Sequence, residues 1–154
     1  MSEVYAINVA KTEFRDGYNA CDVDRVLAVI DSGGFSDKSE GEPSKQGLAA
    51  VSALRARLVR LFAEYSVKMT PIIVDVVVKG NLALGHGWHE FLLTPKLGGE
   101  PIRKRQRYFE QWSKGVDGSW KIAMLFTNSD VKDELNGFSS HWFFSEEKNA
   151  QGSA

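Results

Sequence analysis

The sequence has few of the features that mark a disulfide-bonded, membrane-spanning or strongly charged protein. Cys21 is the only cysteine, which excludes an internal disulfide and is typical of a reducing compartment. No run approaches the roughly 18 uninterrupted apolar residues of a membrane-spanning helix, and the first residues show no secretory leader pattern. The 19 Lys and Arg residues nearly balance the 20 Asp and Glu residues, which disfavours a broad basic surface for nucleic acid. These absences predict a soluble, cytoplasmic protein.

The composition that remains is typical of one globular domain, with 43% hydrophobic and 25% charged residues in 154. We expect this single domain over residues 1–137. Residues 138–154 are expected to form an aromatic tail that ends in a flexible terminus. Its aromatic residues are too apolar for a free end and are expected to cover either the mouth of a cavity or a partner subunit: Phe138, Trp142, Phe143 and Phe144.

Three helices are expected in the first half of the chain. Apolar residues at helical spacing predict the first one: Val4, Ile7, Ala10, Phe14 and Tyr18. Asp22 is a natural N-cap for a short second helix, and the polar, Gly- and Ser-rich segment 31–47 predicts a loop. A third, longer helix is expected over 48–65. Its arginines are expected on a solvated face: Arg55, Arg57 and Arg60.

After Tyr65 the periodicity becomes that of strands. The β-branched and alternating segments predict four strands: 67–79, 81–94, 102–114 and 119–129. The glycines of PKLGGEP and the pair Asp117-Gly118 are typical of hairpin turns between them. The fold class expected is therefore α+β, with three N-terminal helices packed on one face of an antiparallel sheet of about four main strands.

Three segments resemble the nuclear transport factor 2-like (NTF2-like) superfamily, in particular its SnoaL-like branch and related bacterial domains of unknown function. They are NACDVDRVLAVI, KGNLALGHG and FEQWSKGVDGSWKIAMLFTNSD, and the resemblance covers residues 5–130. It implies a cone formed by a curved sheet around the helices, open at one end, and a homodimer through the outer face of the sheet. The superfamily includes ketosteroid isomerase, scytalone dehydratase, polyketide cyclases, a kinase association domain and proteins without known activity, so the fold does not select a function.

The segment HGWHE, residues 86–90, could be read as a metal motif or as a strand. On a strand His86 and His89 point to opposite faces, so they cannot bind one ion together. The same alternation places His86, Trp88 and Glu90 on the outside, where a dimer contact is expected. The basic run RKRQR at 103–107 also alternates, so its three arginines are expected to form a solvated or dimer-facing row.

The inner face of the sheet carries the candidate catalytic residues. A hairpin centred near residues 97–100 would place His89 opposite Tyr108, with Glu110 diagonal to it. In one interpretation His89 is a general base that Glu110 orients, and Tyr108 donates to developing negative charge. In a second, the pair shapes the ligand pocket without chemistry. In a third, His89 and Glu110 satisfy each other's hydrogen bonds in a closed core, or lie in solvent. A β-bulge would invert part of this assignment.

The resemblance to the superfamily adds Asn128 to the polar positions inside the cone. The ligand pocket is expected to include five residues: Phe14, Tyr18, Phe91, Trp112 and Asn128. At the positions where ketosteroid isomerase has its functional residues, the resemblance aligns Phe14, Asp37 or Lys38, and Tyr108. Two of the three roles are unfilled, which disfavours that particular chemistry. Asp37 is expected to be a loop carboxylate, and Cys21 a small packed side chain.

The sequence therefore predicts an internal pocket for a small, apolar or aromatic molecule, with neither a cofactor nor a metal. One alternative adds acid–base chemistry of the isomerase, dehydratase or cyclase type. The other is a non-catalytic dimeric binding or oligomerisation module with a vestigial pocket.

Overall fold

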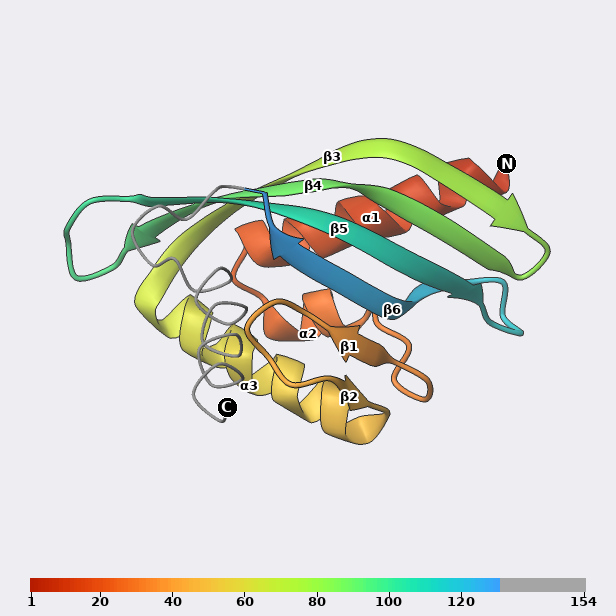
Figure 1. Ribbon diagram of the computed structural model, residues 1–154, viewed down its shortest axis with the longest axis horizontal. Coiled ribbons are helices and arrows are strands. Elements are labelled where there is room, and N and C mark those ends of the chain that lie inside the picture. Colours follow the sequence, from red (N-terminus) through yellow and green to blue (C-terminus); the bar gives the residue numbers. More distant parts are fainter. Residues whose placement is uncertain (131–154) are drawn as a thin grey trace, which may run out of the picture.

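In the computed structural model, which describes residues 1–130, three helices precede the main strands of a six-stranded sheet (Figure 1). The elements are α1 (Glu3–Asn19), α2 (Val23–Leu27), β1 (Ser36–Lys38), β2 (Lys45–Gln46), α3 (Leu48–Glu64), β3 (Tyr65–Lys79), β4 (Leu82–Pro95), β5 (Ile102–Lys114) and β6 (Trp120–Ser129). The three predicted helices and four predicted strands are confirmed, each within a few residues. The aromatic tail expected over 138–154 lies outside the described residues.

The helix starts follow local capping chemistry. The hydroxyl of Ser2 accepts the backbone N–H of Tyr5 at the start of α1. Asp22 accepts the backbone N–H of Arg25 and caps α2, as its position predicted. Within residues 1–130, none of these helices is long and apolar enough to cross a membrane.

The segment 31–47, predicted to be a loop, also contains two short strands. β1 pairs in parallel with β6 and antiparallel with β2, which extends the sheet to the order β2-β1-β6-β5-β4-β3. The backbone N–H and C=O groups on the free side of β6 need hydrogen-bonding partners. A polar segment with no apolar periodicity can supply them. Strand pairing of this kind depends on the backbone, so the side-chain pattern did not reveal it.

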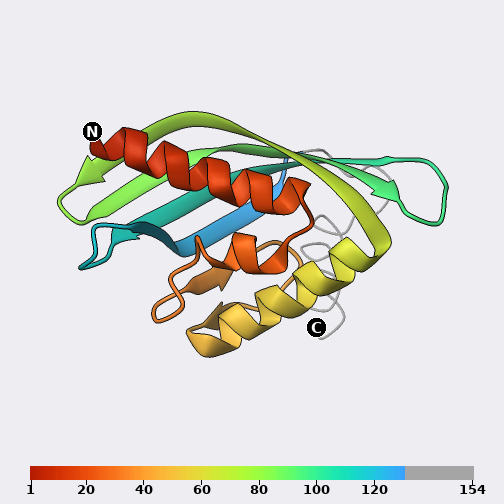
Figure 2. The ribbon, with the colours of Figure 1, turned by 180° about the vertical axis from the view of Figure 1, so that it is seen from behind.

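The sheet is curved, and its two faces differ. Figure 2 shows α1 lying across the inner face of the sheet and α3 running along its lower side. In the view of Figure 1, the opposite, outer face of β3 to β6 is turned toward the reader, and none of the three helices α1, α2 and α3 covers it. The core between α1, α2, α3 and the inner face includes several large side chains: Ile7, Phe35, Leu58, Met69, Trp112 and Ile122.

The register of β4 against β5 differs from the prediction by two residues. His89 lies opposite Gln106, and Tyr108 lies opposite Gly87, so the expected pairing of His89 with Tyr108 is wrong. The hairpin turns one residue earlier than expected. Because the shift in register is an even number, the inner and outer faces of both strands are as predicted.

A β-bulge changes the faces of β6. Gln111 pairs with Met124, but Trp112 pairs with Ile122, so Ala123 is an extra residue. Before the bulge the even-numbered residues of β6 point inward, and after it the odd-numbered residues do. Asn128 is consequently exposed on the outer face, opposite Arg107.

Candidate functional site

A cavity of about 420 Å³ lies between α1, α3 and the inner face of the sheet. Its walls are mostly apolar: Phe14, Tyr18, Leu54, Leu58, Leu61, Phe91, Leu93 and Leu125. His89, from the middle of β4, is the one histidine among its lining residues. Charged residues also line it, from α3 (Arg57, Arg60 and Glu64), from the β1–β2 connection (Glu40 and Glu42) and from β5 (Lys104). Polar and apolar groups therefore meet in one concave space.

The aromatic side chains of this wall pack against one another. The ring centroid of Tyr18 lies 5.1 Å from that of Phe14 and 5.6 Å from that of Phe91, both with edge-to-face geometry. Three of the five expected pocket residues thus form one cluster beside His89, whose ring is 6.0 Å from Phe14. Burial raises the pKa of the Tyr18 hydroxyl to about 12, so this residue is a neutral hydrogen-bonding group.

The other two expected pocket residues lie elsewhere. Trp112 is fully buried behind the cavity, where its indole N–H donates to Glu110 Oε1 at 3.0 Å. Asn128 points to the outer face because of the bulge at Ala123, and the prediction for it is wrong. Thr127, its neighbour, lines the cavity in its place.

The expected contact between His89 and Glu110 contains a third residue, Lys11 of α1. The Lys11 Nζ lies 2.8 Å from His89 Nε2 and 2.7 Å from Glu110 Oε2. All three residues are about 2% exposed. Glu110 therefore orients Lys11, and Lys11 orients the histidine; the direct histidine–carboxylate pair is absent.

The ammonium of Lys11 also lies over an aromatic face. Its Nζ is 4.0 Å from the ring centroid of Tyr108, close enough for a cation–π interaction. Tyr108 in turn stacks on His89, with ring centroids 4.2 Å apart and planes 13° from parallel. Tyr108 thus contributes the face of its ring to this cluster, in contrast to the hydroxyl donor that was expected. Burial raises the pKa of its hydroxyl above the ordinary value, and the charge of Glu110 raises it further.

The electrostatics of the cluster favour a neutral histidine. Burial lowers the pKa of His89 well below its ordinary value of 6.5, and the charge of Lys11 lowers it further. Burial also lowers the pKa of Lys11, while Glu110 acts in the opposite direction. An ion pair between Lys11 and Glu110, next to an uncharged His89, satisfies these constraints.

Gly87 is required where the neighbouring strand and Tyr108 approach the backbone of β4. A Cβ at position 87 would come 1.9 Å from the carbonyl oxygen of Ile72 and 3.2 Å from Tyr108 Cε1. A Cβ at position 85 would lie 3.6 Å from Glu110 Cγ, which is an ordinary contact distance, so the packing does not require glycine there. The alternation in LGHGWH therefore presents two glycines and then His89 to the inner face.

Lys11 was missed at the sequence level, although a signal was present. It lies four residues after Ile7 and three before Phe14, on the predicted apolar stripe of the first helix. Ala10 was assigned to that stripe, whereas the structure buries Lys11 and leaves Ala10 partly exposed. A lysine at such a position is either a snorkelling side chain or a buried charge with a partner.

Asp37 and Arg57 form a second ion pair beside the cavity, in which only the carboxylate is fully buried. Asp37 is 3% exposed on β1, and Arg57 Nη2 donates to its Oδ2 at 2.7 Å. The expectation of a loop carboxylate and of a solvated Arg57 is therefore wrong. Ser39 donates its hydroxyl and backbone N–H to the other carboxylate oxygen, which fixes the β1–β2 connection next to the cavity.

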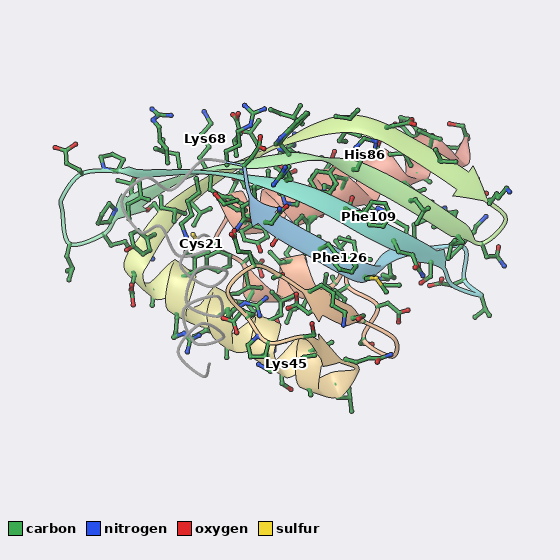
Figure 3. All side chains as sticks on the ribbon, in the orientation of Figure 1. Cys21, Lys45, Lys68, His86, Phe109 and Phe126 are labelled. Atoms are coloured by element: carbon green, nitrogen blue, oxygen red, sulfur yellow. The ribbon has the colours of Figure 1, made fainter. Side chains whose placement is uncertain are left out.

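The remaining residues of HGWHE lie on the outer face, as the strand alternation predicted. His86 is exposed (Figure 3), the Trp88 indole donates to Asp130, and Glu90 pairs with Arg105 at 3.1 Å. No three His, Cys, Asp or Glu side chains within the described part of the chain are grouped so as to hold a metal ion.

No family model and no curated protein matches the sequence. Solved structures do match, and they identify the fold. Among solved structures, a ketosteroid isomerase-like protein from Erwinia carotovora atroseptica SCRI1043 is similar with a TM-score of 0.72 and 20% identity, over 85% of this chain and 98% of that one.

An NTF2-like superfamily protein from Salmonella enterica serovar Typhimurium LT2 has a TM-score of 0.67 and 15% identity, over 84% of this chain and 92% of that one. An NTF2-like protein with a cystatin-like fold from Novosphingobium aromaticivorans has a TM-score of 0.68 and 13% identity, over 88% of this chain and 87% of that one. At such identities the similarity concerns the fold. This chain has the α+β fold of the NTF2-like superfamily, in agreement with the resemblance of its sequence.

Proposed function

We propose that the protein binds a small, largely apolar or aromatic molecule in the cavity beside His89. The observation that carries this proposal is the cavity itself, whose volume lies in the range of ligand pockets, roughly 300–1,000 Å³. One part of its wall is apolar and aromatic, as in many such pockets, and the polar and charged residues lie around it. An apolar ligand would gain from burial against Phe14, Tyr18 and Phe91, and His89 would supply a directional contact.

The geometry supports binding more directly than acid–base catalysis. A general base needs a free lone pair within reach of the substrate. His89 Nε2 faces the Lys11 ammonium, and Glu110 is enclosed between Lys11 and Trp112. One structural neighbour is named ketosteroid isomerase-like. For this chain, cofactor-free chemistry of the isomerase, dehydratase or cyclase type would require a base other than this pair.

The test is to fill the cavity. Leu61 lines it from α3 and is partly exposed, so Leu61→Trp should occupy part of the space without emptying the core. Binding of 2-acetylnaphthalene, measured by calorimetry or by ligand-observed NMR, should weaken at least tenfold in this variant. Val59→Trp changes an exposed position on the same helix and should leave the affinity unchanged. Equal affinity in both folded variants would contradict binding in this cavity.

A second candidate function, homodimerisation through the outer sheet face, has its own observation. Five apolar residues there are exposed by 37–56% and form what we call the outer stripe: Ile72, Val77, Leu84, Phe109 and Phe126. They come from four adjacent strands, and Figure 3 shows Phe109 and Phe126 next to each other on β5 and β6. Exposed apolar residues on a sheet face that no helix of residues 1–130 covers are typical of a protein interface. This stripe supports a non-catalytic oligomerisation module as the alternative.

A further inference from the structure

We propose that Lys11 is a positioning residue that keeps the proton of His89 on Nδ1, so that the cavity selects ligands presenting an acceptor oxygen, such as a carbonyl. This inference rests on the proposed binding function and adds to it the chemical class of the ligand. It follows from three features of the cluster: the direction of the hydrogen bond between Lys11 and His89, the charge of Lys11, and a second ring nitrogen, Nδ1, that has no partner within residues 1–130.

The direction of the hydrogen bond follows from the donor inventory of the two side chains. A lysine ammonium has three N–H donors and no acceptor. At 2.8 Å from Lys11 Nζ, His89 Nε2 must therefore be the acceptor. A neutral imidazole with one accepting nitrogen carries its proton on the other, so Nδ1 is the N–H.

The charge of Lys11 is supported by all of its neighbours. Glu110 Oε2 lies 2.7 Å from Nζ, and the ring of Tyr108 presents its negative face at 4.0 Å. With His89 Nε2, these groups give a partner to each of the three ammonium donors. Trp112 donates to the second oxygen of Glu110, so each carboxylate oxygen accepts a hydrogen bond and the carboxylate is held against the ammonium.

The second ring nitrogen remains available for a ligand. His89 lines the cavity, and Nδ1 has no hydrogen-bonding partner within residues 1–130. Within residues 1–130, two side-chain polar atoms are fully enclosed and have no hydrogen-bonding partner: Asn8 Oδ1 and Arg105 Nε. His89 Nδ1 is not one of them. In this proposal Nδ1–H faces the cavity and is the group that a bound molecule meets.

The chemistry of the recognised group follows from these facts. Nδ1–H can donate to a carbonyl, ester, amide or carboxylate oxygen and cannot accept from a hydroxyl or an amine. Because His89 remains neutral, the contact polarises an acceptor oxygen without adding a full positive charge. The apolar surroundings strengthen such a hydrogen bond and penalise a ligand that leaves the donor unpaired.

The first test needs no ligand and no variant. In the ¹⁵N-labelled protein at pH 7, the two-bond ¹H–¹⁵N correlation pattern of His89 should show a protonated Nδ1 and an unprotonated Nε2. Its signals are assigned by their loss in His89→Gln. Protonation on Nε2, or on both nitrogens, would overturn the proposal whether or not any ligand binds.

The second measurement tests the role of Lys11. The double variant Lys11→Met/Glu110→Leu removes both charges and so leaves neither one unpaired in the core. Loss of the pure Nδ1–H pattern in this variant, with the fold retained by circular dichroism, is expected. An unchanged pattern would show that Lys11 does not position the proton.

The third measurement tests the ligand class with two molecules of similar shape. 2-Acetylnaphthalene, which carries a carbonyl, should bind about fivefold more tightly than 2-ethylnaphthalene, the usual effect of one net hydrogen bond. The preference should disappear in His89→Leu and persist in His86→Leu, the matched change on the outer face. Equal affinities in the wild type would overturn the ligand class. If neither compound binds, the proposed function fails together with the ligand class, and the His89 spectrum still decides the role of Lys11.

Discussion

The two faces of β4 and β5 carry the same kinds of residues in opposite environments. Toward the inside, Glu110 pairs with Lys11, and the two side chains are 3% and 2% exposed. Toward the outside, Glu90 pairs with Arg105 at a comparable distance, and these side chains are 45% and 42% exposed. Each face also has one histidine of the HGWHE segment. The difference between the faces is therefore one of solvent access.

Solvent access decides what each pair contributes. An exposed pair is screened by water and contributes about 0–1 kcal/mol. A buried pair gains little relative to a well-packed apolar pair, but the loss of one partner leaves an uncompensated charge in the core. The inner pair therefore fixes Lys11, His89 and Glu110 relative to each other. Replacing a residue of the outer pair should change the free energy of unfolding only slightly.

The largest effect is expected for the single replacement Lys11→Met. It leaves Glu110 buried without its counter-charge, which should lower the free energy of unfolding by about 3–5 kcal/mol. Arg105→Met on the outer face should lower it by about 1 kcal/mol or less. Urea denaturation followed by circular dichroism measures both. Equal losses for the two variants would remove the energetic distinction between the faces.

The double variant Lys11→Met/Glu110→Leu sharpens this comparison. Because no charge is left unpaired, it should be more stable than Lys11→Met alone, and the coupling between the two sites should be strongly non-additive. Additive losses would mean that the two side chains do not interact in solution.

A smaller effect is expected from pH. The pKa of His89 lies well below 6.5 in the folded protein because of burial and the charge of Lys11. As the pH falls below 6.5, the unfolded chain binds a proton that the folded chain does not. The free energy of unfolding should therefore fall by about 1.4 kcal/mol per pH unit until the pH reaches the folded-state pKa, with no contribution above 6.5.

The measurement compares urea denaturation at pH 7.5 and pH 5.5 in the wild type and two histidine variants. His89→Gln should lose this component of the pH dependence, and His86→Gln should retain it. A wild-type slope that persists in His89→Gln would assign the acid sensitivity to other groups, such as the carboxylates.

The alternation of apolar residues was enough to predict much of this molecule. It located three helices and four strands. Strand parity then separated His89 from His86 on β4, and the resemblance to the superfamily indicated that the face with His89 is the inner one. These features are local, because they depend on residues close together in the sequence.

The missed features depend on contacts between distant segments. The register of β4 against β5 depends on where the hairpin turns, and the side-chain pattern is unchanged by a shift of two residues. The bulge at Ala123 turns Asn128 from the inner to the outer face. The residues around Ala123 do not differ from those of a regular strand, so the sequence does not indicate the bulge. Lys11 and Glu110 are 99 residues apart, so neither one indicates the partner that makes its burial tolerable.

The smallest change in the stability of a single chain is expected on the outer stripe. Phe109 and Phe126 are 41% and 43% exposed, and their rings meet edge to face at 6.5 Å. Replacing both by serine should lower the free energy of unfolding of one chain by about 1 kcal/mol or less, since a cross-strand aromatic pair is lost but no core is opened.

The same double replacement should have a large effect on assembly if the outer stripe is a dimer interface. Analytical ultracentrifugation should show two copies in the wild type and one in Phe109→Ser/Phe126→Ser, because aromatic residues at the centre of an interface dominate its energy. Val116→Ser removes a fully exposed apolar side chain from the β5–β6 turn and should leave the dimer intact. A single copy in the wild type would contradict the dimer.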